Sequence, residues 1–413
     1  MRISSLQMFN IARNSMANSN KDIMRTQQEM SEGKRILTPA DDPVASTKIL
    51  QLTDELANID QYLKNLDIAE NNLNLEESIL GSVVNIIHRM QEIAVAAGNT
   101  ATLTDKEYQA FAAEVSARTD EMVNLLNTRN ANGDYIFGGY KSGSAPFTGD
   151  SFSGFQYRGD DGQQHIKVAN NTKVATTDSG KSIFLDVQSA NKTFDTSASP
   201  ANKANPPAKI NVGQVVNQQT YDEFYPEDIV ITFNAESALS PAGKNFTATE
   251  RTTGRVIVAN QPYVPGSEIV LKGVSVRIVG QPMDGDRFFI ESSEKQGILT
   301  TLARFKEAMN GFDGSSEGRT ELAEIIATTL SNLGNGLTSV VNVQTKIGAR
   351  MNTVESSRDL HLDTQLVNKK IVSQLRDVDY AEAATRLSQQ SLILQAAQQS
   401  FIRVSQLNLF SRL

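Results

Sequence analysis

The chain has 413 residues and a mass of 45.1 kDa, which is enough for roughly two to four domains. It contains no cysteine, which excludes a disulfide scaffold, a Cys-ligated metal site and thiol catalysis. With 39 Lys+Arg against 47 Asp+Glu, it lacks the basic field that general nucleic-acid binding needs, and its 39% apolar content is low for one large compact core.

The N-terminal stretch predicts a sparsely apolar helix. One narrow column repeats every seven residues, among Asn, Gln and Ser, and consists of Phe9, Met16, Ile23 and Met30. The first twenty residues contain no uninterrupted apolar stretch of the signal-peptide kind. No later run approaches the length of a transmembrane helix, so we expect neither a cleaved signal peptide nor a membrane span.

The positions of the 11 prolines divide the rest of the chain. Pro39 and Pro43 share one short loop, and the other nine lie between Pro146 and Pro282. Because proline breaks helix interiors, the proline-free stretches 44–145 and 283–413 can form long helices and the middle cannot.

A very long helix is predicted over 43–98. Asp42 followed by Pro43 is typical of a helix start, and Gly98-Asn99 of a helix end. A buried column repeats every seven residues: Leu52, Ile59, Leu66, Leu73, Leu80, Ile87 and Ala94. We expect a companion column at Ile49, Leu56, Leu63 and Val84, interrupted by Glu70 and Glu77. About 55 residues at a rise of ~1.5 Å each would make the molecule elongated.

A shorter helix is predicted over 105–130, with Tyr108, Phe111, Val115, Met122 and Leu125 on one face. Residues 146–290 then change to β-branched runs bounded by Pro, Gly and Asn, as at 228–233, 255–258 and 274–279. This pattern predicts a β-rich insert. The Ser-, Ala- and Asn-rich residues 187–209 are predicted to be a weakly ordered loop.

The C-terminal part mirrors the N-terminal part. Leu333, Val340, Ile347 and Val354 repeat every seven residues, flanked by Leu330, Leu337 and Met351. A final narrow column consists of Tyr380, Leu387, Leu394 and Phe401. Helices this sparsely apolar are marginal alone, so we expect the two ends to pair with each other and with copies of the chain. An intramolecular hairpin on a globular body is the open alternative.

We therefore predict a mainly α protein with a β insert: an elongated discontinuous helical bundle with terminal coiled-coil helices and an inserted β-rich domain. Residues 1–41 and 372–413 would form the terminal coiled-coil domain that carries polymerisation, 42–145 and 291–371 the helical bundle, and 146–290 the β-rich domain. The predicted subunit contacts are Phe9, Met16, Ile23, Met30, Tyr380, Leu387, Leu394 and Phe401.

Residues that could carry chemistry are few. His88, His165 and His361 have no second ligand at metal-binding spacing, and we expect them to face solvent. Asp41-Asp42 could suggest a metal site, but helix capping explains Asp42 without a metal. Arg158-Gly159-Asp160 has the sequence of an adhesion tripeptide, and we interpret this match as a coincidence. We predict no enzyme, no cofactor and no metal.

Three stretches resemble the flagellin superfamily. They are Ser31-Glu32-Gly33-Lys34-Arg35-Ile36 with Asp41-Asp42-Pro43-Val44-Ala45, Gly133-Asp134-Tyr135-Ile136-Phe137-Gly138-Gly139, and Asp377-Val378-Asp379-Tyr380-Ala381 leading to Leu407-Asn408-Leu409-Phe410. Within the superfamily, Asp-Asp-Pro-Val-Ala is similar to the branch that forms the junction between hook and filament.

The resemblance implies a structural subunit of the bacterial flagellum that joins hook to filament and assembles through its terminal helices, with the β domain facing outward. It implies export without a cleaved signal peptide to an extracellular position. The implied partners are copies of the chain, hook-associated protein 1 on the hook side, flagellin on the filament side and a cytoplasmic export chaperone, with neither nucleic acid nor membrane. The alternatives are flagellin itself, the major filament subunit, and a surface adhesin or enzyme carried by the β insert.

Overall fold

The structure is a computed structural model that describes residues 5–99, 103–312 and 314–410. It divides into two compact units. One consists of Met1–Asn65 with Ser356–Leu413, and the other of Leu66–Glu355. Two long helices, α2 (Pro43–Ala97) and α6 (Ser316–Arg376), contribute to both units.

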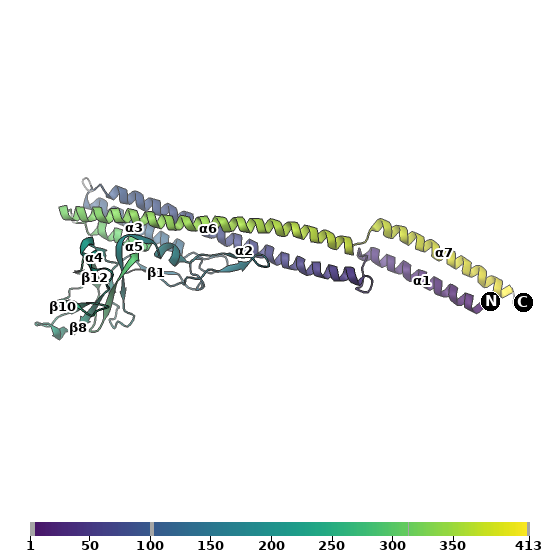
Figure 1. Cartoon of the computed structure of the whole chain (residues 1–413), viewed down its shortest axis with the longest axis horizontal. Helices are drawn as coiled ribbons and strands as arrows, with labels where there is room; N and C mark the ends of the chain where they lie inside the picture. The colour runs from purple at the N-terminus through teal and green to yellow at the C-terminus, as the bar shows by residue number, and fades with distance from the viewer. Residues whose placement is uncertain (1–4, 100–102, 313, 411–413) are drawn as a thin grey trace. The chain divides into compact units, whose positions relative to one another are not determined.

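The first unit is entirely helical. It contains α1 (Ser5–Glu32), the beginning of α2 (Pro43–Ala97), the end of α6 (Ser316–Arg376) and α7 (Tyr380–Phe410). Figure 1 shows α1 and α7, far apart in sequence, running side by side. The break between α1 and α2 lies beside the break between α6 and α7, because Lys34 in the first and Asp377 in the second form an antiparallel bridge. Gly33 adopts a φ of 69°, a left-handed conformation that favours glycine, as α1 ends.

Helix α2 starts and ends where its sequence predicts. The Asp42 carboxylate accepts a hydrogen bond from the Ala45 N–H at 3.0 Å, and Pro43 occupies the first helical position. The helix ends at Ala97, directly before Gly98. All seven residues of the predicted main column are buried, from Leu52 to Ala94.

The second unit joins helices to the β-rich region. Its helices are the remainder of α2, α3 (Asp105–Leu126), α5 (Ile298–Asn310) and most of α6. Tyr108, Val115 and Met122 of α3 are buried, as is the α6 column Leu333, Val340, Ile347 and Val354. Within the described ranges, no helix has the length and apolar character needed to cross a membrane.

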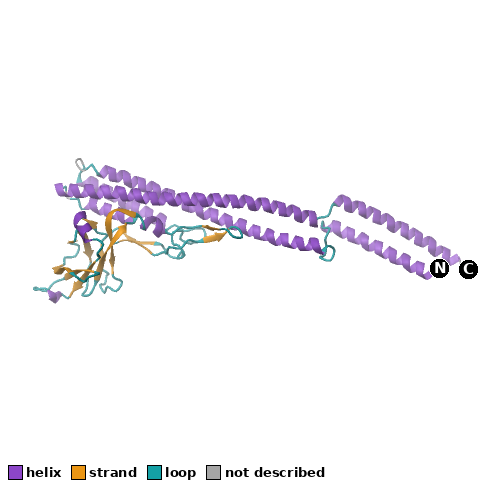
Figure 2. Cartoon of the chain, viewed as in Figure 1, coloured by secondary structure: helices purple, strands orange, loops and turns teal. Residues whose placement is uncertain are grey.

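The strands lie between α3 and α5 in sequence, and Figure 2 shows most of them gathered in one region, with a short strand standing apart alongside the helices. A five-stranded antiparallel sheet has the order β10-β9-β8-β13-β5, and a second sheet has the order β11-β12-β6 with β7 also paired to β12. Their shared core includes Phe194, Tyr221, Phe233, Phe246 and Phe288. The strands are β1 (Phe147–Asp150), β2 (Gly154–Tyr157), β3 (His165–Lys167), β4 (Lys173–Ala175), β5 (Gln188–Ala198), β6 (Lys209–Ile210), β7 (Gln214–Val215), β8 (Ile229–Asn234), β9 (Asn245–Glu250), β10 (Val256–Pro262), β11 (Glu268–Leu271), β12 (Val274–Val279) and β13 (Arg287–Lys295), with the short helix α4 (Gln218–Phe224) after β7.

The predicted fold class is confirmed: long helices flank a central β-rich region. The strands predicted over 228–233, 255–258 and 274–279 correspond to β8, β10 and β12. The predicted domain limits at 290 and 372 fall inside β13 and α6, respectively.

The weakly ordered loop predicted over 187–209 is wrong in its first half, because β5 occupies Gln188–Ala198. Its polar sequence forms an eleven-residue strand, of which seven residues pair with β13, and it buries Phe194.

Two further predictions need correction. Ile49, Leu56, Leu63 and Val84 are only half-buried, whereas the second buried column of α2 in the 66–355 unit is Ala69, Glu76, Val83, Met90 and Ala97. His361 does not face solvent: it is buried, and its ring stacks on Tyr62 with centroids 5.3 Å apart. His88 and His165 are exposed, as predicted.

Candidate assembly site

Helices α1 and α7 form an antiparallel pair along the predicted terminal columns. The rings of Phe9 and Phe401 lie 5.0 Å apart near one end, and the Tyr380 hydroxyl donates to the Met30 carbonyl at 3.1 Å near the other. Between these two contacts, the seven-residue steps bring two further pairs to matching levels, Met16 with Leu394 and Ile23 with Leu387. The structure thus brings four of the eight predicted residues into contact, Phe9 with Phe401 and Tyr380 with Met30.

The pair is only partly buried. Met16, Ile23, Leu387, Leu394 and Phe401 are half-buried, and Phe9 and Tyr380 are exposed. The apolar contact between α1 and α7 is therefore narrow, and it stabilises the two helices only weakly, because most helix stability comes from packing. A groove of about 370 Å³ remains open beside it, lined by Met8, Ile11, Ala12, Ser15, Ala397, Ser400 and Phe401.

Other large apolar residues of these helices lie on exposed surface outside the two columns. Ile11 is 59% exposed, Met24 69%, Leu392 66% and Ile393 59%. Sequence reasoning missed these residues because it searched for a seven-residue repeat. The available signal was a large apolar residue outside the seven-residue column, on a helix that is otherwise rich in polar residues. Several such residues on one exposed face can mark a contact surface.

A buried carboxylate fixes α1 against α7 near the interruption. Glu29 is 4% exposed and pairs with Arg25 at 3.3 Å on its own helix and with Arg386 of α7 at 2.6 Å. Thr26 donates to Gln390 across the same interface at 2.9 Å. These charged and polar contacts set the register that the thin apolar seam alone would leave weakly defined.

Asp41 closes the loop between α1 and α2. Its carboxylate accepts the backbone N–H groups of Thr38 at 2.9 Å and Leu37 at 3.1 Å, and it pairs with Arg25 at 2.7 Å. The Thr38 hydrogen bond, with the Leu37 bond and the Arg25 charge, holds the pKa of Asp41 below its usual value, against the opposing effect of burial. Asp41 and Asp42 are therefore both engaged by the chain itself.

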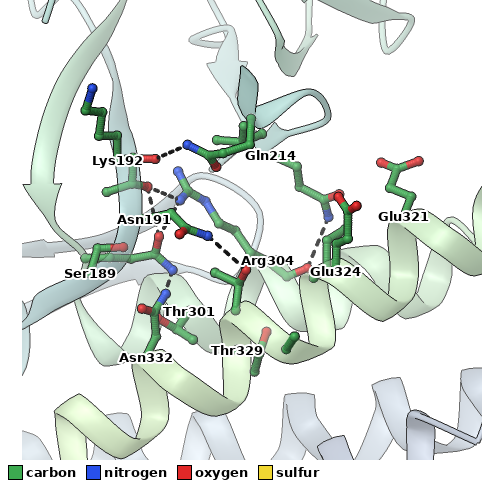
Figure 3. A pocket seen from close by; sticks show the side chains of 17 residues that line it. Ser189, Asn191, Lys192, Gln214, Thr301, Arg304, Glu321, Glu324, Thr329 and Asn332 are labelled. Carbon is green, nitrogen blue, oxygen red and sulfur yellow. Dashed lines mark hydrogen bonds between the residues drawn. The ribbon is translucent and has the colours of Figure 1, made fainter. Parts of the chain in front are cut away.

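A polar pocket of about 380 Å³ lies in the 66–355 unit, between β5, α5 and α6 (Figure 3). The Arg304 guanidinium donates to Thr193 Oγ1 at 2.7 Å, Gln296 Oε1 at 2.6 Å and the Phe194 carbonyl at 2.7 Å. Burial lowers the pKa of Arg304 to about 10, so it keeps its charge at neutral pH. The unpartnered Arg304 Nε and Asn332 Nδ2 each expose less than 1 Å². The pocket walls therefore mainly fasten β5 to the two helices.

Comparison with known proteins identifies the relatives of the chain. Residues 3–142 match the model of the bacterial flagellin N-terminal helical region, and 330–413 that of the C-terminal helical region, together more than half of the chain. Flagellar hook-associated protein 3 of Salmonella typhimurium is 37% identical over 147 residues, 36% of this chain and 46% of that protein. Flagellin of Listeria monocytogenes is 25% identical over 28% of this chain and 39% of its own length.

The chain thus spans less than half the length of these curated relatives. The crystal structure of hook-associated protein 3 from Legionella pneumophila superposes with a TM-score of 0.53 at 26% identity, covering 79% of this chain and 98% of that one. The likeness to this structure extends well beyond the matched terminal sequences.

Proposed function

The chain belongs to the flagellin family, and we propose that it is a structural subunit of the bacterial flagellum that joins the hook to the filament. Residues 1–41 and 372–413 carry its polymerisation, 42–145 and 291–371 form the helical bundle, and 146–290 form the outer β-rich domain. The subunit acts outside the cell and reaches its position without a cleaved signal peptide. Its role is mechanical, not enzymatic.

The exposed apolar residues of the α1–α7 pair carry this proposal. Ile11, Met24, Leu392 and Ile393 face water in the isolated chain, beside a pair that is itself thinly packed. Burial of apolar surface stabilises an assembly by about 25 cal/mol per Å². A neighbour that covers these residues would stabilise the pair and the contact together, and head-to-tail contacts that do not close produce a helical array.

The partners proposed for this surface are copies of the chain, hook-associated protein 1 on the hook side and flagellin on the filament side. A cytoplasmic export chaperone would hold the terminal residues before export. We propose neither nucleic acid nor a membrane as a partner. The eight column residues, Phe9 to Phe401, serve both the α1–α7 pair and its contacts with neighbours.

The major filament subunit is the second candidate. Higher identity to hook-associated protein 3 than to flagellin favours the junction role. Immunogold labelling of assembled flagella separates the two, because a junction protein gives one band at the hook end and a filament subunit labels the whole length.

An adhesin carried by the β region has less support. The carboxylate of Asp160 in the Arg158-Gly159-Asp160 tripeptide accepts the backbone N–H groups of Tyr140 at 2.8 Å and Gly162 at 2.9 Å. It is therefore occupied within its own loop.

Complementation of a bacterium that lacks the corresponding gene tests the junction proposal. Chains without 1–41 or without 372–413 should be folded and soluble yet unable to retain filaments on hooks. Phe401→Asp should also reduce attachment, because an aromatic pair contributes about 0.5–1.5 kcal/mol and a charge disfavours the seam. Gln399→Asp, at an exposed position on the same helix, is the matched control and should attach filaments normally. Normal attachment by either truncated chain would contradict the proposal.

A further inference from the structure

Helix α2 places a carboxyl group inside the core of the 66–355 unit. Glu76 is 0% exposed and occupies the second buried column, between Ala69 and Val83. Neither of its carboxyl oxygens has a hydrogen-bond partner in the described part of the chain. Leaving a buried carboxyl without partners is costly, so this position calls for an explanation beyond packing.

The neighbours of Glu76 form an ion pair between two other parts of the fold. Arg350 of α6 donates to both carboxylate oxygens of Asp178, at 2.6 and 3.0 Å. Asp178 follows β4, is itself 5% exposed, and also accepts a hydrogen bond from Gln163. The pair thereby fastens the segment 163–180, which contains the β3–β4 hairpin, to the helices.

Arg350 binds one buried carboxylate, Asp178, and acts on the second buried carboxyl group, Glu76, through its charge. Asp178 and Arg350 are the charged groups that act on Glu76 from the elements packed against it, while Glu77, next to it on α2, is exposed. Burial, and then the charge of Asp178, raise the pKa of Glu76 well above its usual value, and the charge of Arg350 and the nearby backbone N–H of Asp178 only partly oppose them. The cluster is balanced when Glu76 is neutral and carries an excess negative charge when it ionises.

The segment also meets the rest of the unit through hydrogen bonds outside the cluster. The Gly180 N–H donates to the Phe137 carbonyl at 3.0 Å and the Ser179 hydroxyl to the Asp160 carbonyl at 2.8 Å, whereas the Thr176 N–H donates to the Gln164 carbonyl at 2.8 Å within the segment itself. Strand β5, which follows after 181–185, is held separately, by Arg304 of α5 and Asn332 of α6. A loss of the Arg350–Asp178 pair would therefore loosen the segment 163–180 on α6.

We propose that Glu76, Arg350 and Asp178 form a protonation-dependent latch that holds the segment 163–180 on the helices when Glu76 is neutral and loosens it when Glu76 ionises. An ionised Glu76 competes with Asp178 for the single guanidinium in a medium where charges interact strongly. The latch would make the attachment of the segment 163–180 sensitive to the pH around the protein.

The direction of the pH dependence follows from linkage. A carboxyl whose pKa is higher in the folded state than in the unfolded state stabilises the fold below its unfolded pKa. That stabilisation is lost as pH rises from the unfolded pKa through the raised folded value. The latch is therefore closed on the acid side and opens on the alkaline side.

Amide hydrogen exchange on the full chain, corrected for intrinsic exchange rates, tests the latch. Between pH 6 and pH 9.5 the protection of the Thr176 and Gly180 amides should fall at least tenfold more than that of Ile231 in β8. In Glu76→Gln, which keeps the shape of the side chain but cannot ionise, this excess fall should be less than twofold. Glu77→Gln, the matched exposed control, should behave as the wild type.

Asp178→Asn supplies an independent readout, because it removes the charge that Arg350 holds. Protection of Thr176 and Gly180 should already be reduced at pH 6 in this variant. The proposal is overturned if the wild-type protection does not depend on pH, if Glu76→Gln retains the full fall, if Glu77→Gln abolishes it, or if Asp178→Asn leaves protection at pH 6 intact.

Discussion

Arg304→Met should strongly destabilise the 66–355 unit. Arg304 is 7% exposed on α5, and its two terminal nitrogens reach the hydroxyl of Thr193, the amide oxygen of Gln296 and the carbonyls of Phe194 and Val212. Its guanidinium also lies 4.4 Å from the centre of the Phe194 ring. Methionine keeps most of the length of the side chain and removes every donor.

The magnitude follows from what remains after the substitution. Each buried acceptor that loses its donor costs about 1–3 kcal/mol, although water entering the neighbouring 380 Å³ pocket would satisfy part of this set. Removal of the buried charge gives some stability back, since desolvation of a guanidinium is unfavourable. A net loss of about 3–5 kcal/mol is expected once the cost of the unpaired acceptors and the regained desolvation energy are combined. This corresponds to a fall in Tm of roughly 6–20 °C.

Differential scanning calorimetry of the full chain measures the effect. Arg118→Met is the matched control, because Arg118 lies on α3 with its side chain 43% exposed and pairs with the 49% exposed Glu121. An exposed ion pair contributes about 0–1 kcal/mol, so this control should melt almost as the wild type does. Equal Tm values for the two variants would refute the role assigned to Arg304.

Two smaller effects can be measured locally. Asp42→Ala should cost about 1 kcal/mol at the start of α2, seen as faster amide exchange at Ala45 and Ser46, and unchanged exchange there would exclude a capping role. Burial opposes ionisation of Asp150, but donors from Lys209 and Ser153 outweigh it and lower its pKa to about 2. The stability that Asp150 contributes is therefore present above about pH 4 and lost as pH falls towards 2. Lys209→Met should raise the Asp150 titration midpoint in carboxyl NMR, and an unmoved midpoint would contradict this assignment.

Features that repeat locally along the chain were predictable. The main column of α2 and its Asp42 cap depend on neighbours within one or two turns, so sequence spacing alone locates them. The second column was misplaced because the side of the main column that a helix buries depends on where its neighbouring helices lie. Carboxyl residues did not discriminate, since Glu70 and Glu77 interrupt the predicted column as Glu76 interrupts the buried one. Strand β5 was missed because its order comes from β13, about a hundred residues later.

The candidate site was predictable to the same extent. The seven-residue columns of the termini include residues that meet in the α1–α7 pair, Phe9 with Phe401 and Tyr380 with Met30. They do not identify Ile11, Met24, Leu392 or Ile393, because whether an off-column residue is covered depends on where the partner helix lies. The Arg304 network joins residues as far apart as 111 positions, and no local pattern encodes such a contact.

Strands β5 and β13 meet at the point where the β-rich region departs from the helices. Gln188 at the beginning of β5 pairs with Lys295 at the end of β13, and Asn335 of α6 donates to the Gln188 carbonyl at 2.9 Å. The chain therefore leaves the helical part and returns to it at adjacent points. An excursion with neighbouring ends can be lengthened, shortened or exchanged while the helices keep their packing. Foreign sequences could therefore be inserted in loops of the stretch 188–295, provided that Thr193, Phe194 and Val212 keep their contacts with Arg304 of α5.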